Sequence, residues 1–298
     1  MQIIPKNKVV FDFNKKNNFN YSVEDGEIFY VETDDCYSGQ IKDESIKRPD
    51  IDISIMDCSV GPIEVKGAKA GDVLEIEVID IELAKQGVMV TSPGLGVLGD
   101  KIIEADTKII KIENGFAYFS DKIKIPLTPM MGVIGVFPKE EGVHCAVPRE
   151  HGANMDTKII KKGTKVFLPV FVDGAGLAIG DLHACMGDGE LSGTGIEIAG
   201  KVCLKVKVRK EITLERPMLE TREEIYTIGS AENFKEAIKL AVDDMVLFLM
   251  KKLDLNFPDA YRLLSATCDI QISQVVNDLV TVRVKAPKLH LNIQSLIN

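Results

Sequence analysis

Residues 73–82 constrain the fold most, because their apolar and polar side chains alternate with a period of two. The stretch reads VLEIEVIDIE, and Gly71-Asp72 supplies a turn just before it. Successive side chains of a β-strand point to opposite faces of the sheet. The pattern therefore predicts a half-buried strand, with its aliphatic side chains toward a core and its carboxylates toward solvent.

Strands dominate the first 215 residues. Similar patterns predict strands at 1–13, at 27–33, in the proline-punctuated apolar segment 123–138, and in the run KVCLKVKVRKEITLE at 201–215. The basic residues of this last run lie on one face, as expected of a solvated strand face. These segments predict a mainly β fold.

The pattern changes near Arg216-Pro217. Apolar residues recur at helical spacing in 231–253, with Ser230 as the expected N-cap, and Pro258 opens a second expected helix that runs through Ala266. The segment LVTVRVK at 279–285 is expected to be a final strand. We therefore predict a β-rich region, 1–215, and an α+β C-terminal subdomain, 216–298, packed as one compact unit.

Charge and cysteine usage exclude several classes of partner and compartment. The 298 residues include 45 acidic and 36 basic side chains, a formal net charge of −9, which disfavours nucleic acid and anionic membranes as partners. No apolar run reaches the roughly 20 residues of a membrane-spanning helix, and the N-terminal residues do not resemble a signal peptide. Six scattered cysteines indicate reduced thiols, so a cytoplasmic location is expected.

Possible ligands and acid/base groups are concentrated between His151 and Glu197. Three pairs in this stretch stand two residues apart: Asn154 and Asp156, Asp181 and His183, Asp188 and Glu190. Two strand residues at this spacing share a face, and Gly187 with Asp188-Gly189 permits a tight turn that would return the last pair toward the second. One imidazole among several carboxylates suits zinc or another divalent ion. In the alternative interpretation Asp188-Gly189 is an ordinary turn, Asp181 a loop residue and His183 a satisfied core histidine.

Two other motifs carry less weight. Residues 94–99 match G-x-G-x-x-G, but Pro93 precedes them and strands are expected after them, so no helix N-terminus is available for a dinucleotide. His144 and Cys145 are adjacent, and adjacent strand residues point to opposite faces, which disfavours them as a catalytic pair.

Several segments together resemble the acetamidase/formamidase family. The resemblance rests on the loop Gly152–Asp156, the strand Pro169–Ala175 and the segment GDLHACMGDGE from Gly180 to Glu190, with further matches at 61–83, 123–138 and 260–284. It covers nearly the whole chain. Two residues depart from the family pattern: Ala153 replaces a glycine, and Met186 stands where many members carry glutamine.

The resemblance implies a β-sandwich-like catalytic body that hydrolyses short linear amides, such as formamide or acetamide, to a carboxylate and ammonia. It also implies a homodimer or higher homo-oligomer, for which the helix at 231–253 offers apolar side chains off its main stripe. A further matching segment contains Asp35, Cys36 and Gly39-Gln40-Ile41. On this basis Asp35, Gln40 and Met186 are expected to contact substrate.

The residue types suggest a mechanism. A divalent ion, expected to be zinc with calcium as the alternative, would be bound by some of Asp156, Asp181, His183 and Glu190 and would activate a water molecule. Asp188 or Glu190 would carry the proton, and Asn154 or a glycine N–H would stabilise the oxyanion. Two other functions stay open: a metal-free amidase with Cys36 or Cys145 as nucleophile, and a non-enzymatic calcium-binding β module.

Overall fold

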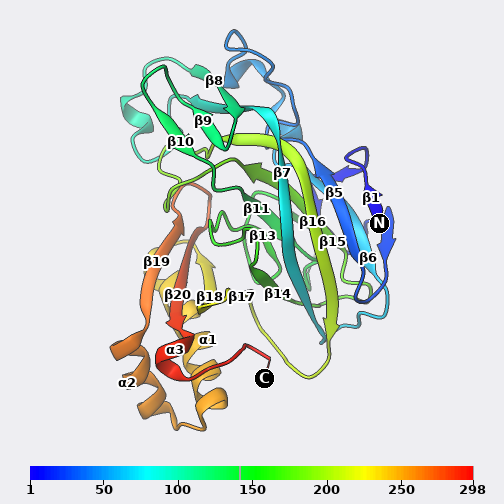
Figure 1. The fold of residues 1–298 in the computed structure, drawn as a ribbon, viewed down its shortest axis with the longest axis vertical. Helices are drawn as coiled ribbons and strands as arrows, with labels where there is room; N and C mark the ends of the chain where they lie inside the picture. Colours follow the sequence, from blue (N-terminus) through cyan, green and yellow to red (C-terminus); the bar gives the residue numbers. More distant parts are fainter. Residues whose placement is uncertain (141, 298) are drawn as a thin grey trace.

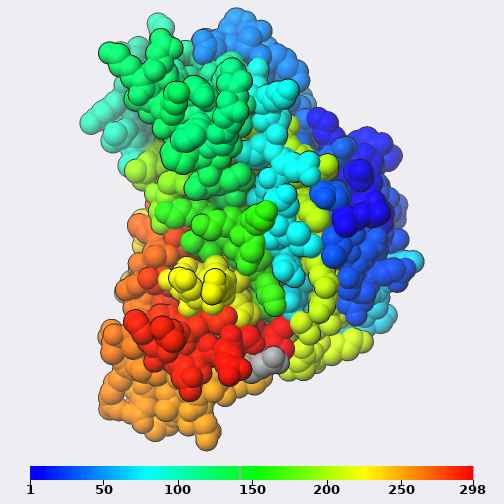
Figure 2. All heavy atoms as spheres, viewed as in Figure 1, coloured from blue at the N-terminus to red at the C-terminus, as the bar shows by residue number. Residues whose placement is uncertain are grey.

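The computed structural model describes residues 1–140 and 142–297, and it is mostly β-structure with helices near its C-terminal end (Figure 1). The predicted fold class is therefore confirmed. The helices lie at one end of the molecule, and the β body makes up the rest (Figures 1 and 2). None of the helices in the described ranges is long and apolar enough to cross a membrane.

The strands of the first half are short except for one. They are β1 (Gln2–Ile4), β2 (Val9–Val10), β3 (Asp12–Phe13), β4 (Tyr21–Val23), β5 (Ile28–Thr33), β6 (Ser59–Val65), β7 (Val73–Thr91), β8 (Asp106–Glu113), β9 (Phe116–Tyr118), β10 (Lys124–Pro126), β11 (Met130–Gly135) and β12 (Val143–His144). The long strand β7 contains the alternating stretch and extends nine residues beyond Glu82. The buried strand expected within 123–138 is β11, in which every residue is buried.

The second half completes the sheet and adds the helices. Its elements are β13 (Gly152–Asn154), β14 (Lys165–Pro169), β15 (Leu177–His183), β16 (Glu197–Arg209), β17 (Met218–Glu220), β18 (Glu224–Ala231), α1 (Phe234–Leu253), α2 (Phe257–Thr267), β19 (Asp269–Gln274), β20 (Val280–Pro287) and α3 (Lys288–Leu291). The second predicted helix is confirmed, with Pro258 in the first turn of α2.

Pairing between β7 and β16 forms the longest ladder of the sheet and explains the basic face of β16. Lys201, Lys205 and Lys207 stand opposite Glu82, Glu77 and Glu75 of β7. The Lys201 Nζ lies 3.0 Å from a Glu82 carboxylate oxygen. Cross-strand pairs of opposite charge contribute about 0.2–1 kcal/mol each, so these pairs help to stabilise the ladder between the two strands.

The N-cap of α1 lies three residues after the predicted one. Asn233 is the cap, and its side chain accepts a hydrogen bond from the Glu236 N–H at 3.0 Å. Ser230 is a residue of β18 instead, and its hydroxyl lies 3.0 Å from that of Thr281 on β20. The expected cap was wrong because pairing of β18 with β20 continues through Ala231 and delays the helix.

Two hydrophobic cores meet at β17 and β18. The larger core lies among the strands of the β body and includes Leu219 and Tyr226. The smaller one lies beneath α1 and includes Met218 and Ile225, together with Phe167 of β14. Alternate residues of β17 and β18 thus contribute to both cores. The boundary at residue 215 stays a prediction, although the two regions pack against one another as expected.

Candidate active site

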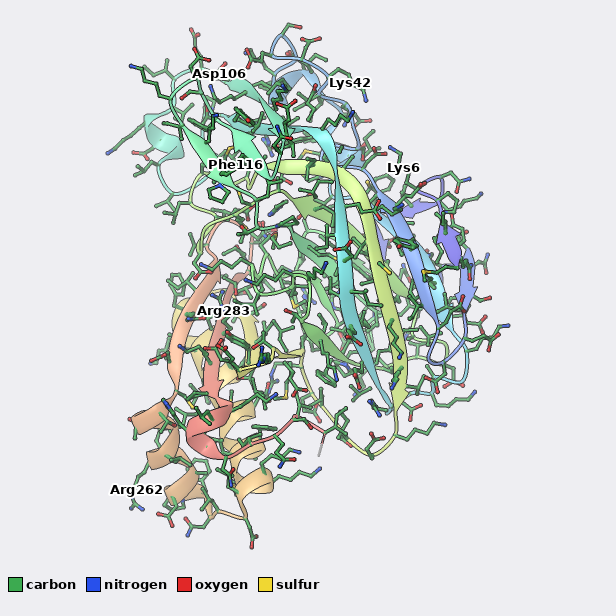
Figure 3. The ribbon with its side chains drawn as sticks, in the orientation of Figure 1. Lys6, Lys42, Asp106, Phe116, Arg262 and Arg283 are labelled. Carbon is green, nitrogen blue, oxygen red and sulfur yellow. The ribbon has the colours of Figure 1, made fainter. Side chains whose placement is uncertain are left out.

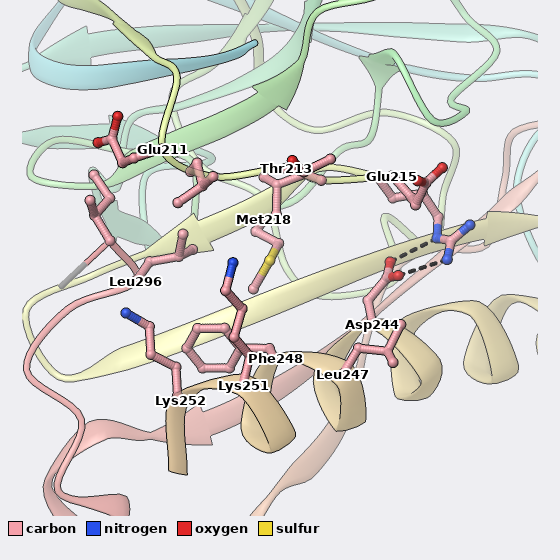
Figure 4. Close-up of a pocket in the computed structure, with 14 residues that line it drawn as sticks. Glu211, Thr213, Glu215, Met218, Asp244, Leu247, Phe248, Lys251, Lys252 and Leu296 are labelled. Atoms are coloured by element: carbon pink, nitrogen blue, oxygen red, sulfur yellow. Dashed lines mark hydrogen bonds and ion pairs between the residues drawn. The ribbon is translucent and has the colours of Figure 1, made fainter. Parts of the chain in front are cut away.

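Four of the candidate residues, Asn154, Asp156, Asp181 and Glu190, line a small polar cavity of about 200 Å³. A larger cavity, about 490 Å³, lies between α1 and the segment 211–218 (Figure 4). That cavity is lined largely by apolar side chains such as Leu214, Leu247 and Phe248, and by none of the predicted site residues. Chemistry, not size, therefore identifies the smaller cavity as the candidate site.

His183 is at the centre of a buried carboxylate cluster. Its Nε2 lies 3.2 Å from Asp181 Oδ1 and 3.1 Å from Glu197 Oε2. The same nitrogen is 4.0 Å from Asp156 Oδ1 and 4.0 Å from Glu190 Oε1. His183 ends the buried strand β15, so this imidazole is held by a strand, as expected.

Three carboxylates of the cluster stand on strained backbone. Asp156, Asp181 and Glu190 have φ of 39°, 55° and 49°, the left-handed region that residues other than glycine seldom adopt. Each such residue costs on the order of 1–2 kcal/mol, and strain of this kind is commonly concentrated at functional sites. All three residues line the candidate cavity.

The electrostatics of the cluster are dominated by burial. Burial raises the pKa of Asp156 to about 7 and that of Asp181 to about 6, with the Asp181 carboxylate also raising the first. Burial and the neighbouring carboxylates raise the pKa of Glu190 well above its ordinary value. For His183, burial lowers the pKa, but Glu197 and Asp181 outweigh it and raise the pKa well above its ordinary value.

The donor atoms have the separations that a bound cation requires. Asp156 Oδ1, Glu197 Oε2 and His183 Nδ1 are buried and form no hydrogen bond within the described residues. A tetrahedral ion with bonds of about 2.1 Å holds its ligand atoms about 3.4 Å apart, and the four distances from His183 Nε2 bracket that value. The possible ligand atoms form two groups, and within each group the atoms lie within 4.8 Å of one another. One group consists of Asp156, His183 and Glu190, and the other consists of Cys36, Asp181 and Glu197. The residues therefore fit a divalent metal.

Asp188 is not brought into this cluster. Its carboxylate accepts two hydrogen bonds, at 2.8 and 2.9 Å, from the guanidinium of Arg283, a buried residue of β20 that is labelled in Figure 3. The Lys158 ammonium lies 2.9 Å away on the same carboxylate. The expected turn does form, since the Glu190 N–H donates to the Gly187 carbonyl. It returns Glu190 to the cluster and directs Asp188 to β20, so the expected position of Asp188 was wrong.

The three residues expected to contact substrate do not line the cavity. Asp35 is buried, and its Oδ1 accepts hydrogen bonds from the backbone N–H groups of Tyr37 and Gly39. The Gln40 side chain bonds to backbone atoms of Tyr37 and Asp52, and Met186 is buried outside the cavity wall. The segment does reach the site, but through the neighbouring side chains of Cys36 and Tyr37.

Some polar residues that line the cavity were not assigned a role from the sequence: Arg48, Asp57 and Asn277. Glu197 also lines the cavity, and the sequence counted it only among the possible ligands of the stretch from His151 to Glu197. Asn277 follows β19, and its Nδ2 donates to Asp156 Oδ2 at 3.1 Å and to the Asn154 carbonyl at 3.3 Å. It belongs to the segment 260–284, which contributed to the family resemblance without a role being assigned to any of its residues. Asn154 also lines the cavity, and its Oδ1 is buried without a hydrogen bond in the described part of the chain.

Neither candidate cysteine nucleophile is activated. Burial raises the pKa of Cys145 to about 12, and its thiol donates to the Val10 carbonyl. Burial, together with the carboxylates of Glu197 and Asp181, raises the pKa of Cys36 well above its ordinary value. A low thiol pKa is the usual mark of a reactive cysteine, so the burial of these two thiols disfavours the metal-free alternative.

The chain is similar to proteins of one family along most of its length. The model of the Acetamidase/Formamidase family matches residues 13–144 and 139–284. Crystal structures of an acetamidase from Bacillus halodurans (42% identity, TM-score 0.96, 98% of this chain and 99% of that one) and of a predicted acetamidase/formamidase from Thermoanaerobacter tengcongensis (43%, 0.96, 99% and 98%) share its fold.

Curated sequences are more distant. A formamidase from Methylophilus methylotrophus is 27% identical over 248 residues, which take in 63% of this chain and 61% of that protein. Across the curated relatives it matches, the chain spans between 61% and 65% of their length. The family match and the shared fold nevertheless cover nearly the whole chain, which therefore belongs to the acetamidase/formamidase family.

Proposed function

We propose that the protein hydrolyses short linear amides, of the formamide or acetamide type, to a carboxylate and ammonia. The observation that carries the proposal is the His183 cluster, in which four carboxylates surround one imidazole nitrogen at the wall of a cavity. The cavity, about 200 Å³, is smaller than the roughly 300–1,000 Å³ of sites for drug-sized ligands. The names of the related proteins support the same substrate class.

The proposed cofactor is a divalent ion held by Asp156, Asp181, His183 and Glu190. An imidazole with a neighbouring thiol favours zinc, since calcium takes six to eight oxygen ligands. When bound, such an ion supplies Lewis acidity, which activates a water molecule and polarises a carbonyl group. We therefore propose zinc, with calcium as the alternative. Metal analysis of the purified protein distinguishes the two.

The remaining roles fall to side chains outside the ligand set. Asn154 Oδ1 lacks a partner within the described residues and can accept a hydrogen bond from the N–H of a primary amide. Asp57 lines the cavity and belongs to neither ligand group, so we assign it the transfer of a proton from water to the leaving nitrogen. Water oxygen bonds to the carbonyl carbon, the C–N bond breaks, and the nitrogen leaves as ammonia.

Chelation and a matched pair of histidine variants test this function. Ammonia release from formamide and acetamide should be lost after exhaustive chelation and restored by zinc. His183→Ala should lose both metal and turnover, since even residues beyond the ligands cost roughly 10–100-fold in affinity. His290→Ala, in α3, is the control and should match the parent.

Other results would contradict the proposal. Turnover that survives chelation would remove the metal mechanism, and loss on alkylation alone would favour a cysteine nucleophile. An ion retained without ammonia release from any small amide would favour the calcium-binding module instead.

We also propose a homodimer or higher homo-oligomer in the cytoplasm. Leu247 on α1 is 57% exposed beside the larger cavity (Figure 4), whereas Val246 is buried within the chain. Six free cysteines suit a reducing compartment. Light scattering tests the assembly, and a monomer mass for the parent would remove this part of the proposal.

A further inference from the structure

The second group of ligand atoms needs its own explanation. Cys36 Sγ, a carboxylate oxygen of Asp181 and one of Glu197 lie within 4.8 Å of one another, and all three residues are buried. No member of this group belongs to the group of Asp156, His183 and Glu190. The two groups are nonetheless contiguous, since His183 Nε2 is 3.2 Å from Asp181 Oδ1 and 3.1 Å from Glu197 Oε2.

One ion does not use six donors productively. A zinc ion with four ligands that kept one position open for water would bind three of these side chains and leave three unused. The unused groups would include buried carboxylates, and a buried charge without a partner is strongly unfavourable. Only 2% of Glu197 is exposed, and its Oε2 lies 3.1 Å from Nε2 of His183, whose imidazole would be a ligand of the first ion.

The charge balance also calls for more than one ion. Asp156, Asp181, Glu190 and Glu197 are four buried carboxylates beside one cavity. Arg48 is the only lysine or arginine among the described residues of the cavity wall, and Asp57 offsets it. With the four carboxylates and the Cys36 thiolate ionised as ligands, two divalent ions offset four of the five negative charges, whereas one ion offsets only two.

The backbone fixes Cys36 for such a role. Asp35 Oδ1 accepts the N–H groups of Tyr37 and Gly39, at 3.0 and 2.9 Å, which closes a turn around the cysteine. The Cys36 carbonyl accepts the Asp57 N–H at 2.8 Å. The thiol is thereby held at the cavity wall before any ligand arrives.

We propose that this site holds two divalent ions, the second of them bound by the thiolate of Cys36 with Asp181 and Glu197. The inference rests on the proposed function for the first ion, whose ligands would be Asp156, His183 and Glu190, with Asp181 shared between the two ions. A thiolate prefers a softer ion such as zinc. As the sulfur–metal bond forms, the S–H proton is released to solvent. Carboxylates that bridge neighbouring ions separate them by about 3.5–4 Å in two-metal sites.

Cobalt substitution tests the thiolate ligand without any use of activity. The purified protein is stripped, reloaded with Co²⁺, and measured for metal content and for the ultraviolet absorption band that a cobalt–thiolate bond produces. The parent should bind two ions per chain and show the band. Cys36→Ser should bind one ion and lose the band, and Cys36→Asp should regain the second ion without the band.

Cys58→Ser is the matched control, because Cys58 is a buried cysteine that belongs to neither ligand group. It should keep two ions and the full band. A parent that binds one ion, or a band that persists in Cys36→Ser, would overturn the inference. If Cys36→Ser fails to fold, the parent's stoichiometry and band, with the Cys36→Asp variant, decide the matter.

The same measurements separate this inference from the proposed function. Two cobalt ions and a thiolate band without ammonia release would overturn the amide hydrolysis and leave the second site standing. Metal-dependent ammonia release by a one-ion protein that lacks the band would do the reverse.

Discussion

Gly132→Ala tests whether the arrangement of the carboxylates is as tight as the structure indicates. A methyl carbon at Gly132 would stand 2.3 Å from Asp181 Oδ2 and 2.5 Å from Asp156 Oδ1. Such contacts essentially never fall below 3.0 Å, so both carboxylates would have to retreat by at least half an ångström. Gly132 lies in β11, where every residue is buried, which leaves the strand little room to move away.

The expected loss follows from that displacement. A misplacement on the order of 1 Å costs about 100-fold in turnover, and a disturbed ligand arrangement costs roughly 10–100-fold in metal affinity. An added methyl group in a packed interior also costs about 1–3 kcal/mol of stability. We therefore expect Gly132→Ala to fold, to bind metal weakly, and to release ammonia at one hundredth of the parental rate or less.

Gly187→Ala is the control from the neighbouring loop. A methyl carbon there meets nothing within 4 Å, and the backbone is not left-handed, so metal content and turnover should match the parent. Metal content by mass spectrometry, ammonia release and the melting temperature are measured on both variants. A Gly132→Ala protein with full metal and full turnover would show that these carboxylates do not form the site.

Two further perturbations separate scaffold from chemistry. Asp188→Asn leaves the buried Arg283 without its carboxylate. We therefore expect the free energy of unfolding, measured by urea denaturation, to fall by about 1–3 kcal/mol, a range already reduced for the partial exposure of Asp188. Turnover per folded molecule should stay within a few-fold; its abolition with unchanged stability would give Asp188 the catalytic role that its spacing predicted. Burial lowers the pKa of His151 from 6.5 to about 3, so only the unfolded chain takes up this proton as the pH falls below 6.5. Because of this group, the free energy of unfolding of the parent should be about 2 kcal/mol lower at pH 5 than at pH 7. The His151→Leu variant should lack this contribution. Equal pH dependence of the two urea midpoints would show that His151 ionises in the folded protein.

The alternation of apolar and polar residues predicted where the main strands lie, but not how the strands pair. The alternation in 73–82 defined β7, and that in 201–215 defined most of β16. The pattern did not show that Lys201 would meet Glu82, because register depends on residues more than one hundred positions apart. Likewise, Ser230 and Asn233 are equally good N-caps in sequence, and only the pairing of β18 with β20 decides between them.

The site shows the same limit. Asp181 and His183 were correctly paired because both belong to β15, where the spacing of two has a local meaning. Asp188 and Glu190 share that spacing but stand in a turn, so they diverge. Arg283, the partner of Asp188, is 95 residues away and has no local signature. The resemblance identified the segment around Asp35 but not that its neighbour Cys36 carries the side chain at the cavity.

The assembled site depends on both ends of the chain. Cys36 comes from the segment after β5, Gly132 from β11, and Asn277 from the turn between β19 and β20. Asn277 holds Asp156, which stands on left-handed backbone, and Arg283 holds the turn that delivers Glu190. Residues with strained backbone persist only where surrounding contacts fix them. The C-terminal part therefore supports the carboxylate cluster. The predicted boundary at residue 215 would divide the candidate site between two segments of the chain.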